Sequence, residues 1–420
     1  MRLAVVSAKY PFGTGEPFLD TELRALAPSF ASVLVYPTTP RERRFGYANV
    51  PANVVRSPLL GAVTLARAAR TFARRPLAAL RAIGTLLSER YPLRGKLKNL
   101  VVVPQGLAFA DVVRARGIEH VHAYWLSTPA TVAWIASRIA GVPFSVTTHR
   151  WDLYENNMAA RKLRDAAFVR TISERGRADL LGMTGGDPAK VAMVRLGVAL
   201  PAISAASPAA ADAGTARPLR IVCAARLVPV KGHDVLIRAL AALRDEGVPF
   251  ECTLAGDGEL RDALAAQIAA AGLGDRVHLA GAIAHDALLE RLRAGEFDAS
   301  VIASIERPGG LMEGVPVALI EAMAAGVVVV ATDSGSVGEL VDASTGVLVA
   351  HSDPAALAAG LARIARDPAL RERLRAAARA RVEAEFDGAR TAERIRALII
   401  GVPATDHGYS RDTCMEAQRC

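Results

Sequence analysis

The chain has 420 residues, of which 51% are apolar and 5% aromatic, and its formal net charge is +9. This length allows two or three domains, and the composition is that of a globular α/β protein rather than a disordered or fibrous one. The four cysteines show no CxxC spacing, so neither a zinc site nor a disulfide framework is expected, and a reducing cytoplasm is the predicted location. No run approaches the roughly 20 apolar residues of a membrane-spanning helix, and the N-terminus lacks the pattern of a signal peptide.

The positive charge is concentrated in the first half of the chain. Residues 1–200 hold 28 Lys and Arg against 13 Asp and Glu, a balance of +15, whereas the remainder holds 23 against 29, a balance of −6. The excess lies within residues 41–98, where ARAARTFARRPLAALRAIGTLL predicts a pair of basic amphipathic helices. A solvated arginine-rich face is one interpretation, and contact with an anionic membrane or an anionic lipid-linked substrate is the other. Nucleic acid is disfavoured, because no aromatic residues alternate with the basic ones.

Apolar strands alternate with helices along both halves of the chain. RLAVVS, SVLVYP, HVHAYW and PFSVTTH read as strands of the first half, and FLDTELRALAP and ATVAWIASRIAG as helices between them. The pattern restarts with the strands RIVCAAR, FECTLAGDG, RVHLAG, ASVIAS and VVVVATDSG, again separated by helices. This alternation predicts two doubly wound parallel sheets, with ligands at the carboxyl ends of the strands.

These patterns place the domain boundaries. We expect one Rossmann-like domain over residues 1–198 and a linker rich in Ala, Pro and Ser over 199–217. A second Rossmann-like domain follows over 218–385, then a helix over 386–400 that packs back on the first domain. Residues 401–420 have no periodicity and are predicted to form a mobile tail.

The stretch EGVPVALIEAMAAG, residues 313–326, carries two carboxylates around an apolar helix. Pro316 suits the first helical position, so the N–H groups of the following residues are predicted to point out of the helix start and bind an anion such as phosphate. Gly314 lets the backbone approach a ligand. Glu313 then lies in the preceding loop, whereas Glu321 lies within the helix, where a carboxylate can accept from two vicinal hydroxyls of a ribose. We interpret the pair as two ends of one ligand site.

A second cluster follows the first strand of the same half, in AARLVPVKGHD. Arg226 and Lys231 are two cations in one loop, and they could compensate a diphosphate without a metal. Taken alone they could equally be surface charges. The turn LAGDG contains Gly256, at a strand end of a kind common in α/β proteins.

The motifs ARL…KG, LAGDGEL, EGVPVALIEAMAAG, VVVVATDSG and GELV resemble, in the same order, those of retaining GT-B glycosyltransferases of family 4, over most of residues 217–385. The resemblance implies two Rossmann-like domains facing across a cleft, with the acceptor bound by residues 1–198 and the nucleotide sugar by residues 218–385. It implies diphosphate contacts from Arg226 and Lys231, a sugar contact from Glu313 and a ribose contact from Glu321. The backbone near Val317, Ala318 and Leu319 would complete the phosphate site, and the region of Gly281 and Ile283 would select the base. The family usually has Gly where Ala225 stands.

The first half offers residues for the other side of the reaction. The loop KYPFGTGEPFLDTE looks like the family's glycine loop, which implies that Gly13, Thr14 and Gly15 approach the donor phosphate. Its Glu16 and Phe18 are similar to enzymes of colanic-acid type that build extracellular polysaccharide. His149 resembles the family histidine near the reacting carbon, although Arg150 stands where the family often has Gly. Acceptor contacts are predicted from the following residues: Glu16, His122, Trp125, Arg150 and Asp152.

The resemblance implies transfer of a sugar, with retention, from a UDP- or GDP-linked donor to an acceptor that is lipid-linked or a polysaccharide precursor. Front-face attack would be assisted by the leaving diphosphate, which leaves the protein to orient and to stabilise charge. No metal or other cofactor is expected, because neither an Asp-x-Asp motif at a strand end nor a complete His cluster is present. The alternatives are transfer to a small natural product, a non-hydrolysing sugar-nucleotide epimerase, and an inactive GT-B scaffold at the membrane. A peripheral location at the inner face of the plasma membrane is left open.

Overall fold

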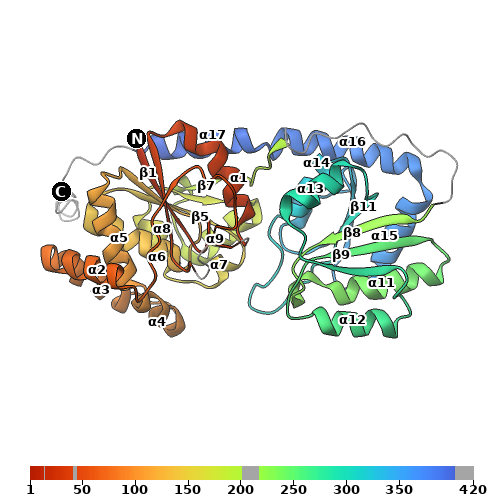
Figure 1. Ribbon diagram of the computed structural model, residues 1–420, viewed down its shortest axis with the longest axis horizontal. Coiled ribbons are helices and arrows are strands. Elements are labelled where there is room, and N and C mark those ends of the chain that lie inside the picture. Colours follow the sequence, from red (N-terminus) through yellow and green to blue (C-terminus); the bar gives the residue numbers. More distant parts are fainter. Residues whose placement is uncertain (14, 41–44, 201–216, 403–420) are drawn as a thin grey trace, which may run out of the picture. The chain divides into compact units, whose positions relative to one another are not determined.

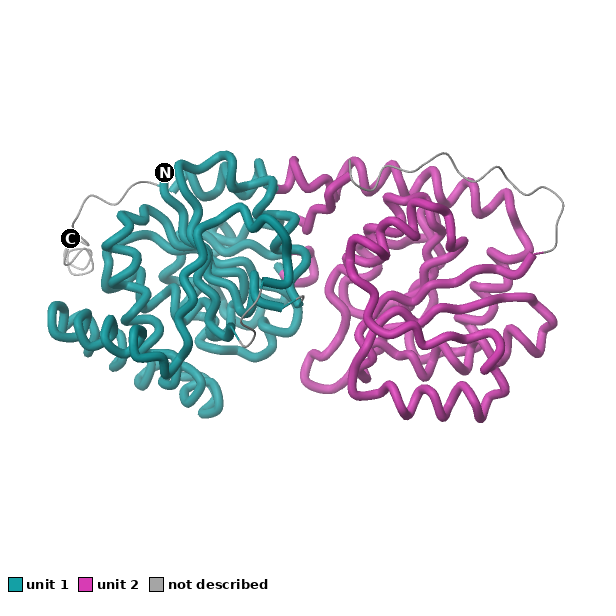
Figure 2. The backbone as a smooth tube through the Cα atoms, viewed as in Figure 1, with its two compact units in different colours: residues 1–171, 177–194, 392–420 teal, residues 172–176, 195–391 magenta. Residues whose placement is uncertain are grey.

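The computed structural model describes residues 1–13, 15–40, 45–200 and 217–402. The chain divides into two compact units, which are coloured separately in Figure 2. Unit 1 comprises residues 1–171, 177–194 and 392–420, and unit 2 comprises residues 172–176 and 195–391. The linker predicted over 199–217 and the tail predicted over 401–420 lie almost entirely outside the described residues.

Unit 1 is built on a seven-stranded sheet of order β3-β2-β1-β4-β5-β6-β7, in which every pairing is parallel. Its strands are β1 (Arg2–Ser7), β2 (Ser32–Pro37), β3 (Asn53–Val54), β4 (His120–Ala123), β5 (Phe144–Thr148), β6 (Val169–Thr171) and β7 (Val191–Met193). The helices between them are α1 (Pro17–Leu26), α2 (Ala62–Arg74), α3 (Pro76–Ser88), α4 (Leu93–Val101), α5 (Val103–Ala115), α6 (Thr128–Ala140), α7 (Trp151–Tyr154), α8 (Ala159–Asp165) and α9 (Glu174–Thr184).

Side chains alternate across this sheet, as parallel strands covered on both faces require. Ala4 and Val6 face a core shared with α5 and α6, whereas Leu3 and Val5 face α1 and the C-terminal helix α17 (Gly388–Ile400). One buried ion pair ties α1 to β6: the Arg170 guanidinium donates to both Glu22 oxygens, at 2.8 and 2.7 Å. Neither side chain has exposed surface, and a buried charge is tolerated only when it is paired in this way.

Unit 2 repeats the design with a six-stranded parallel sheet of order β10-β9-β8-β11-β12-β13. The strands are β8 (Leu219–Ala224), β9 (Phe250–Ala255), β10 (Val277–Gly281), β11 (Ala299–Ile302), β12 (Val328–Asp333) and β13 (Val347–Ala350). The helices are α11 (His233–Asp245), α12 (Arg261–Ala270), α13 (His285–Arg293), α14 (Val317–Ala324), α15 (Pro354–Arg366) and α16 (Pro368–Glu385) (Figure 1). Unit 2 also contains the 3-10 turns η3 (Pro229–Lys231) and η4 (Val337–Glu339), and unit 1 contains η1 (Ala27–Ser29) and η2 (Pro188–Lys190).

The strand order shows where each sheet can hold a ligand. In unit 1 the connections reverse direction between β1 and β4, and in unit 2 between β8 and β11. The loops that follow such strands separate, which leaves a crevice at the carboxyl edge of a doubly wound sheet. The predicted two-sheet fold class is therefore observed. In each unit a ligand is expected at the loops that follow the two strands of the reversal, β1 and β4 in unit 1 and β8 and β11 in unit 2.

Candidate donor and acceptor sites

Lys231 and Glu313 meet in unit 2 from the loops that follow β8 and β11. The Lys231 ammonium donates to Glu313 Oε2 at 2.5 Å, and the Ser304 hydroxyl donates to the same oxygen at 2.7 Å. Lys231 is placed by the 3-10 turn η3, and Ser304 lies just beyond the end of β11. The sequence predicted the two charged groups as parts of one site but not Ser304, whose only signal was its position after a strand.

Glu313 is held as a carboxylate in this position. Burial opposes its ionisation, but the Lys231 charge and the hydrogen bonds from Lys231, Ser304 and the Gly314 amide outweigh that effect, so the pKa of Glu313 is lowered. An ionised, half-enclosed oxygen pair next to a cation can accept hydrogen bonds from sugar hydroxyls. The group is therefore set up to bind, and not to release a proton near neutral pH.

Three glycines make this cluster of loops possible because their neighbours leave no room for a Cβ atom. A Cβ on Gly232 would lie 2.0 Å from the Ala303 oxygen, and one on Gly256 would lie 1.9 Å from the Ala225 oxygen. A Cβ on Gly335 would lie 1.8 Å from the Glu313 oxygen, and this residue also has a left-handed φ of +64°. Gly256 thus has a packing role next to the Arg226 loop, and Gly335, which the sequence did not single out, fixes the Glu313 loop.

The start of α14 corrects the predicted helix boundary. The helix begins at Val317, so Pro316 is the N-cap residue and not the first helical one. Leu319 was predicted to offer a free N–H, but it donates to the Pro316 carbonyl at 3.0 Å, in a tight first turn. The amides of Val317 and Ala318 are the first two of the helix, which have no carbonyl partner within a helix. The anion site that the sequence predicted is reduced to these two groups.

Glu321 lies in α14 with little exposed surface, and its Oε1 lies 2.7 Å from Nε2 of His285 at the start of α13. This hydrogen bond is the largest of several effects that raise the pKa of His285, against the opposing effect of burial. No motif in the sequence pointed to His285. β10 and β11 are separated by β9 and β8 in the sheet, and the two residues come together because α13 and α14, the helices that follow these strands, pack in one apolar cluster.

The other donor residues predicted in this unit occupy the same loops. Arg226 is exposed, and its guanidinium forms no ion pair with any residue that the structure describes, so its charge is available to an anion. Ile283 is half-buried against the apolar cluster that contains α14, and Gly314 follows Glu313 directly. Cys223, next to this loop, is a free buried thiol whose pKa burial raises to about 12, which makes it inert.

In unit 1, Glu16 organises the glycine loop. Its carboxylate accepts from the amides of Lys9 and Tyr10, both at 2.6 Å, and from the indole N–H of Trp125. The side chain is almost fully buried. The predicted acceptor contact from Glu16 is thus replaced by an internal one, which connects the loops after β1 and β4. Gly13 has a left-handed φ of +79° in this loop, Gly15 follows, and Thr14 lies outside the described residues.

His149 follows β5 and lies between aromatic rings. Its ring centroid is 4.7 Å from that of Phe18 and 4.3 Å from that of Trp125. Burial, assisted by the charge of Arg170, lowers the pKa of His149 to about 3, so the ring is neutral. Both ring nitrogens are buried and lack a hydrogen-bond partner among the described residues. Unpaired buried polar atoms are costly, so this ring is suited to complete its bonds with a ligand.

Three other predicted acceptor residues have their side chains engaged within unit 1. His122 has no exposed surface and is hydrogen-bonded to Ser145 and Thr147, at 2.7 and 2.9 Å, so its geometry gives no support to an acceptor contact. Asp152 accepts from the amides of Leu126 and His149, at 2.7 and 2.8 Å, and so holds the loop that carries His149.

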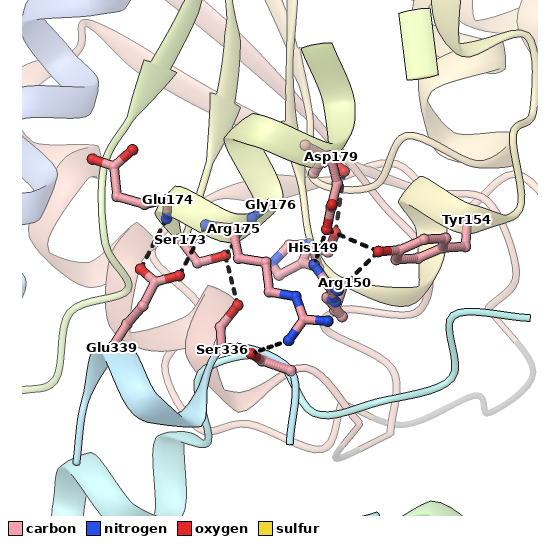
Figure 3. Close-up of polar contacts among 12 residues, drawn as sticks. His149, Arg150, Tyr154, Ser173, Glu174, Arg175, Gly176, Asp179, Ser336 and Glu339 are labelled. Carbon is pink, nitrogen blue, oxygen red and sulfur yellow. Dashed lines mark hydrogen bonds and ion pairs between the residues drawn. The ribbon is translucent and has the colours of Figure 1, made fainter. Parts of the chain in front are cut away.

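Arg150, the third of these residues, lies against Asp179 and Tyr154, at 2.6 and 2.8 Å, as Figure 3 shows. The arginine that replaces the family glycine is therefore a buried structural cation. It occupies the loop without reaching free surface.

A further cluster in unit 2 was not predicted. Glu339 accepts from the amides of Glu174 and Arg175, at 2.8 and 2.9 Å, and thereby caps the first turn of α9 (Figure 3). The hydroxyls of Ser173 and Ser336 are 3.1 Å apart in the same cluster. Within the described part of the chain, no group of three or more His, Cys, Asp or Glu side chains could hold a metal ion.

Comparison with known proteins assigns these features to a family. The family described as glycosyl transferases group 1 matches residues 213–381. The amylovoran biosynthesis glycosyltransferase AmsK of Erwinia amylovora is 39% identical over 172 residues, which are 41% of this chain and 42% of that protein. The chain thus spans less than half the length of this relative. A D-inositol 3-phosphate glycosyltransferase of Salinispora arenicola is 31% identical over 337 residues, which are 71% of each protein.

Solved structures extend the likeness to the whole fold. HepE of Anabaena, in complex with UDP, superimposes with a TM-score of 0.70 at 18% identity, covering 96% of this chain and 100% of that one. Sucrose-phosphate synthase from Thermosynechococcus elongatus gives a TM-score of 0.74 at 19% identity, covering 96% and 99%. These neighbours have the GT-B architecture of two Rossmann-like sheets. With the inositol phosphate relative matched over 71% of its length, the chain belongs to the glycosyl transferases group 1 family.

Proposed function

We propose that the protein is a retaining, metal-independent glycosyltransferase that moves a sugar from a nucleoside-diphosphate donor to a lipid-linked or polysaccharide-precursor acceptor of the cell envelope. The observation that carries this proposal is the Lys231–Glu313 pair at the β8–β11 switch point, beside the start of α14. A cation, two free helix amides and an ionised carboxylate within one set of loops match the phosphates and hydroxyls of a nucleotide sugar.

Each residue would then have one role. Lys231 and Arg226 would neutralise the diphosphate as it leaves, and the first amides of α14 would donate to its oxygens. Glu313 would orient the sugar and Glu321 would accept from the ribose hydroxyls. In unit 1, His149 would contribute an uncharged ring that hydrogen-bonds a substrate, because its buried nitrogens have no described partner.

The partner classes are inferred from relatives. HepE is solved with UDP and with UDP and glucose, which supports a nucleotide-sugar donor for this protein. UDP is therefore the first nucleotide to test and GDP the second. AmsK is named for amylovoran biosynthesis, which supports an exopolysaccharide acceptor, whereas the inositol phosphate relative keeps a small-molecule acceptor as the second candidate. Contact of the basic residues 41–98 with an anionic membrane would suit a lipid-linked acceptor.

The test is a panel of UDP-, GDP- and ADP-sugars, read as release of the nucleoside diphosphate, together with thermal shift by each nucleotide. We expect one nucleotide to stabilise the protein and its sugar to be hydrolysed slowly without acceptor. The Lys231→Met variant should lose both effects. The matched control is Arg238→Gln, whose ion pair with Asp234 is exposed on α11. Conversion of the sugar without release of diphosphate would indicate an epimerase, and no stabilisation by any nucleotide would indicate an inactive scaffold.

A further inference from the structure

The exposed apolar side chains of this protein are concentrated on one segment of unit 1. Of the 16 large hydrophobic residues that the structure describes as exposed, ten lie between residues 60 and 101. They include Leu77, at 69% exposure, and Leu93, at 72%. Single exposed hydrophobics are normal on any protein, but a cluster of this size on adjacent helices marks an interaction surface.

Leu60 precedes α2, and the other nine belong to α2, α3 and α4, which form an additional layer outside α5 and α6 (Figure 1). The inward faces of α3 and α4 are already used for packing. On α3 that face is formed by Ala79, Ala82 and Leu86. On α4 it is formed by Gly95 and Asn99. A helix that needed only to cover the sheet would carry polar residues on its other side.

The outward faces of α3 and α4 are instead apolar. At 100° per residue, Leu77, Leu80 and Leu87 fall within about 80° of one another, on the side of α3 opposite its buried face. Leu93, Leu97 and Val101 fall within a similar sector of about 80° on α4, again opposite the buried residues. Each helix thus has a second apolar stripe, and all six side chains are more than half exposed or nearly so. The stripes are a property of both helices, which argues against a local accident.

Positive charge surrounds these stripes. Residues 61–101 contain nine Lys and Arg and one acidic residue, Glu89. Among the residues that the structure describes, no carboxylate lies within ion-pair distance of five of the arginines, all of them exposed: Arg74, Arg75, Arg81, Arg90 and Arg94. A second copy of the same face would bring two such uncompensated sets together, so self-association through this surface is electrostatically disfavoured.

We infer that the outward faces of α3 and α4, with the flanking arginines, dock on an anionic lipid bilayer by inserting their leucines among the acyl chains. We call this set the α3–α4 face: Leu77, Leu80, Leu87, Leu93, Leu97 and Val101. Apolar residues on one face flanked by Lys and Arg are the pattern of helices that lie in the plane of a membrane interface. No described helix has the length and apolarity to cross a bilayer, so the attachment is to the surface. The inference deepens the membrane contact named in the proposed function, but it is tested separately from sugar transfer, because no donor-site residue takes part.

The experiment is flotation of the full chain with vesicles of phosphatidylcholine alone or of phosphatidylcholine with 30% phosphatidylglycerol. We expect binding to the anionic vesicles and little to the neutral ones. The variant Leu77→Gln/Leu80→Gln/Leu87→Gln should lower the partition coefficient at least about tenfold, because the inserted methylene groups are lost. Arg81→Gln/Arg94→Gln should lower it by roughly fivefold per charge, and only this part should vanish in high salt.

The matched control is Met183→Gln, an exposed apolar residue of α9 at 41% exposure, which should bind vesicles as the unchanged protein does. Circular dichroism and nucleotide thermal shift in the same variants show whether the fold and the donor site are intact. If the triple leucine variant bound anionic vesicles as well as the unchanged protein does, the proposed insertion of leucines would be wrong and the binding would be electrostatic alone. A dimer that the leucine changes convert to a monomer, or no binding to anionic vesicles, would also overturn the inference.

Discussion

Lys231 and Glu313 are 82 residues apart in the chain, yet their charged atoms lie 2.5 Å apart. The pair joins the two loops at the switch point of unit 2. A ligand that came between the two groups would remove this ion pair, and each group would then need a new partner. A diphosphate would therefore take over the lysine while the carboxylate turns to the sugar. Such an exchange would make the ion pair a component of binding as well as of local structure.

The first prediction concerns this pair. Lys231→Met and Glu313→Gln should each lower kcat for glycosyl transfer by about 10²–10³-fold, because stabilisation of the leaving group or orientation of the sugar is lost. The double variant should be little worse than the more damaging single one, since the two groups act as a unit. Steady-state kinetics with the active donor measures all three. Additive losses would contradict a shared role.

The second prediction concerns Gly335. Alanine there combines an unfavourable φ of +64° with a clash against the Glu313 carbonyl, so the Glu313 loop has to move. We expect the free energy of unfolding to fall by about 1–3 kcal/mol and donor affinity to weaken. Gly326→Ala is the control, because Gly326 has a similar φ of +76° but no atom within 4 Å of its Cβ position. If both variants lose donor affinity equally, backbone strain and not the Glu313 contact is responsible.

The third prediction concerns pH. The hydrogen bond to Glu321 raises the pKa of His285 above its ordinary value of 6.5 in the folded protein. The stability that this bond contributes is therefore complete below pH 6.5 and is lost as the pH rises through the raised folded pKa. The difference in Tm between the unchanged protein and His285→Gln should be largest near pH 5.5 and should shrink toward pH 8.5. His278→Gln, at an exposed position on β10, is the control for the histidine-to-glutamine change itself.

The fourth prediction concerns Glu16 in unit 1. Glu16→Gln removes the charge that the amides of Lys9 and Tyr10 and the Trp125 indole share. We expect the free energy of unfolding to fall by about 1.5–3 kcal/mol, the range for hydrogen bonds to a charged group. Urea denaturation followed by tryptophan fluorescence measures the change. Glu119→Gln, at 52% side-chain exposure, should change stability by less than about 0.5 kcal/mol. An equally small effect for Glu16 would contradict its role in holding the loop.

The sequence predicted well those features that depend on local pattern. Alternation of apolar strands and helices indicates both sheets, and the motif around Glu313 and Glu321 places one residue in a loop and the other in a helix, as observed. The predicted first residue of α14 was wrong by one position, because proline suits both the N-cap and the first helical position. Ser304, Gly335 and His285 were missed because their importance depends on which loops become neighbours. His122 and Arg150 were predicted as ligand contacts from their position near strand ends, but position in the chain does not reveal that neighbouring side chains already occupy them.

The C-terminal helix has a practical consequence for dividing the protein. Ala392, Ile395 and Ile399 of α17 pack against Leu3 and Val5, so unit 1 is assembled from the two extremes of the chain. A fragment that stops at residue 200 would expose the apolar side chains of β1 that α17 covers. A fragment that starts at 217 would expose the apolar face of α17. We therefore expect neither fragment to fold as an independent domain. Chimeras that exchange specificity with a relative should therefore graft the last helix together with the first strand.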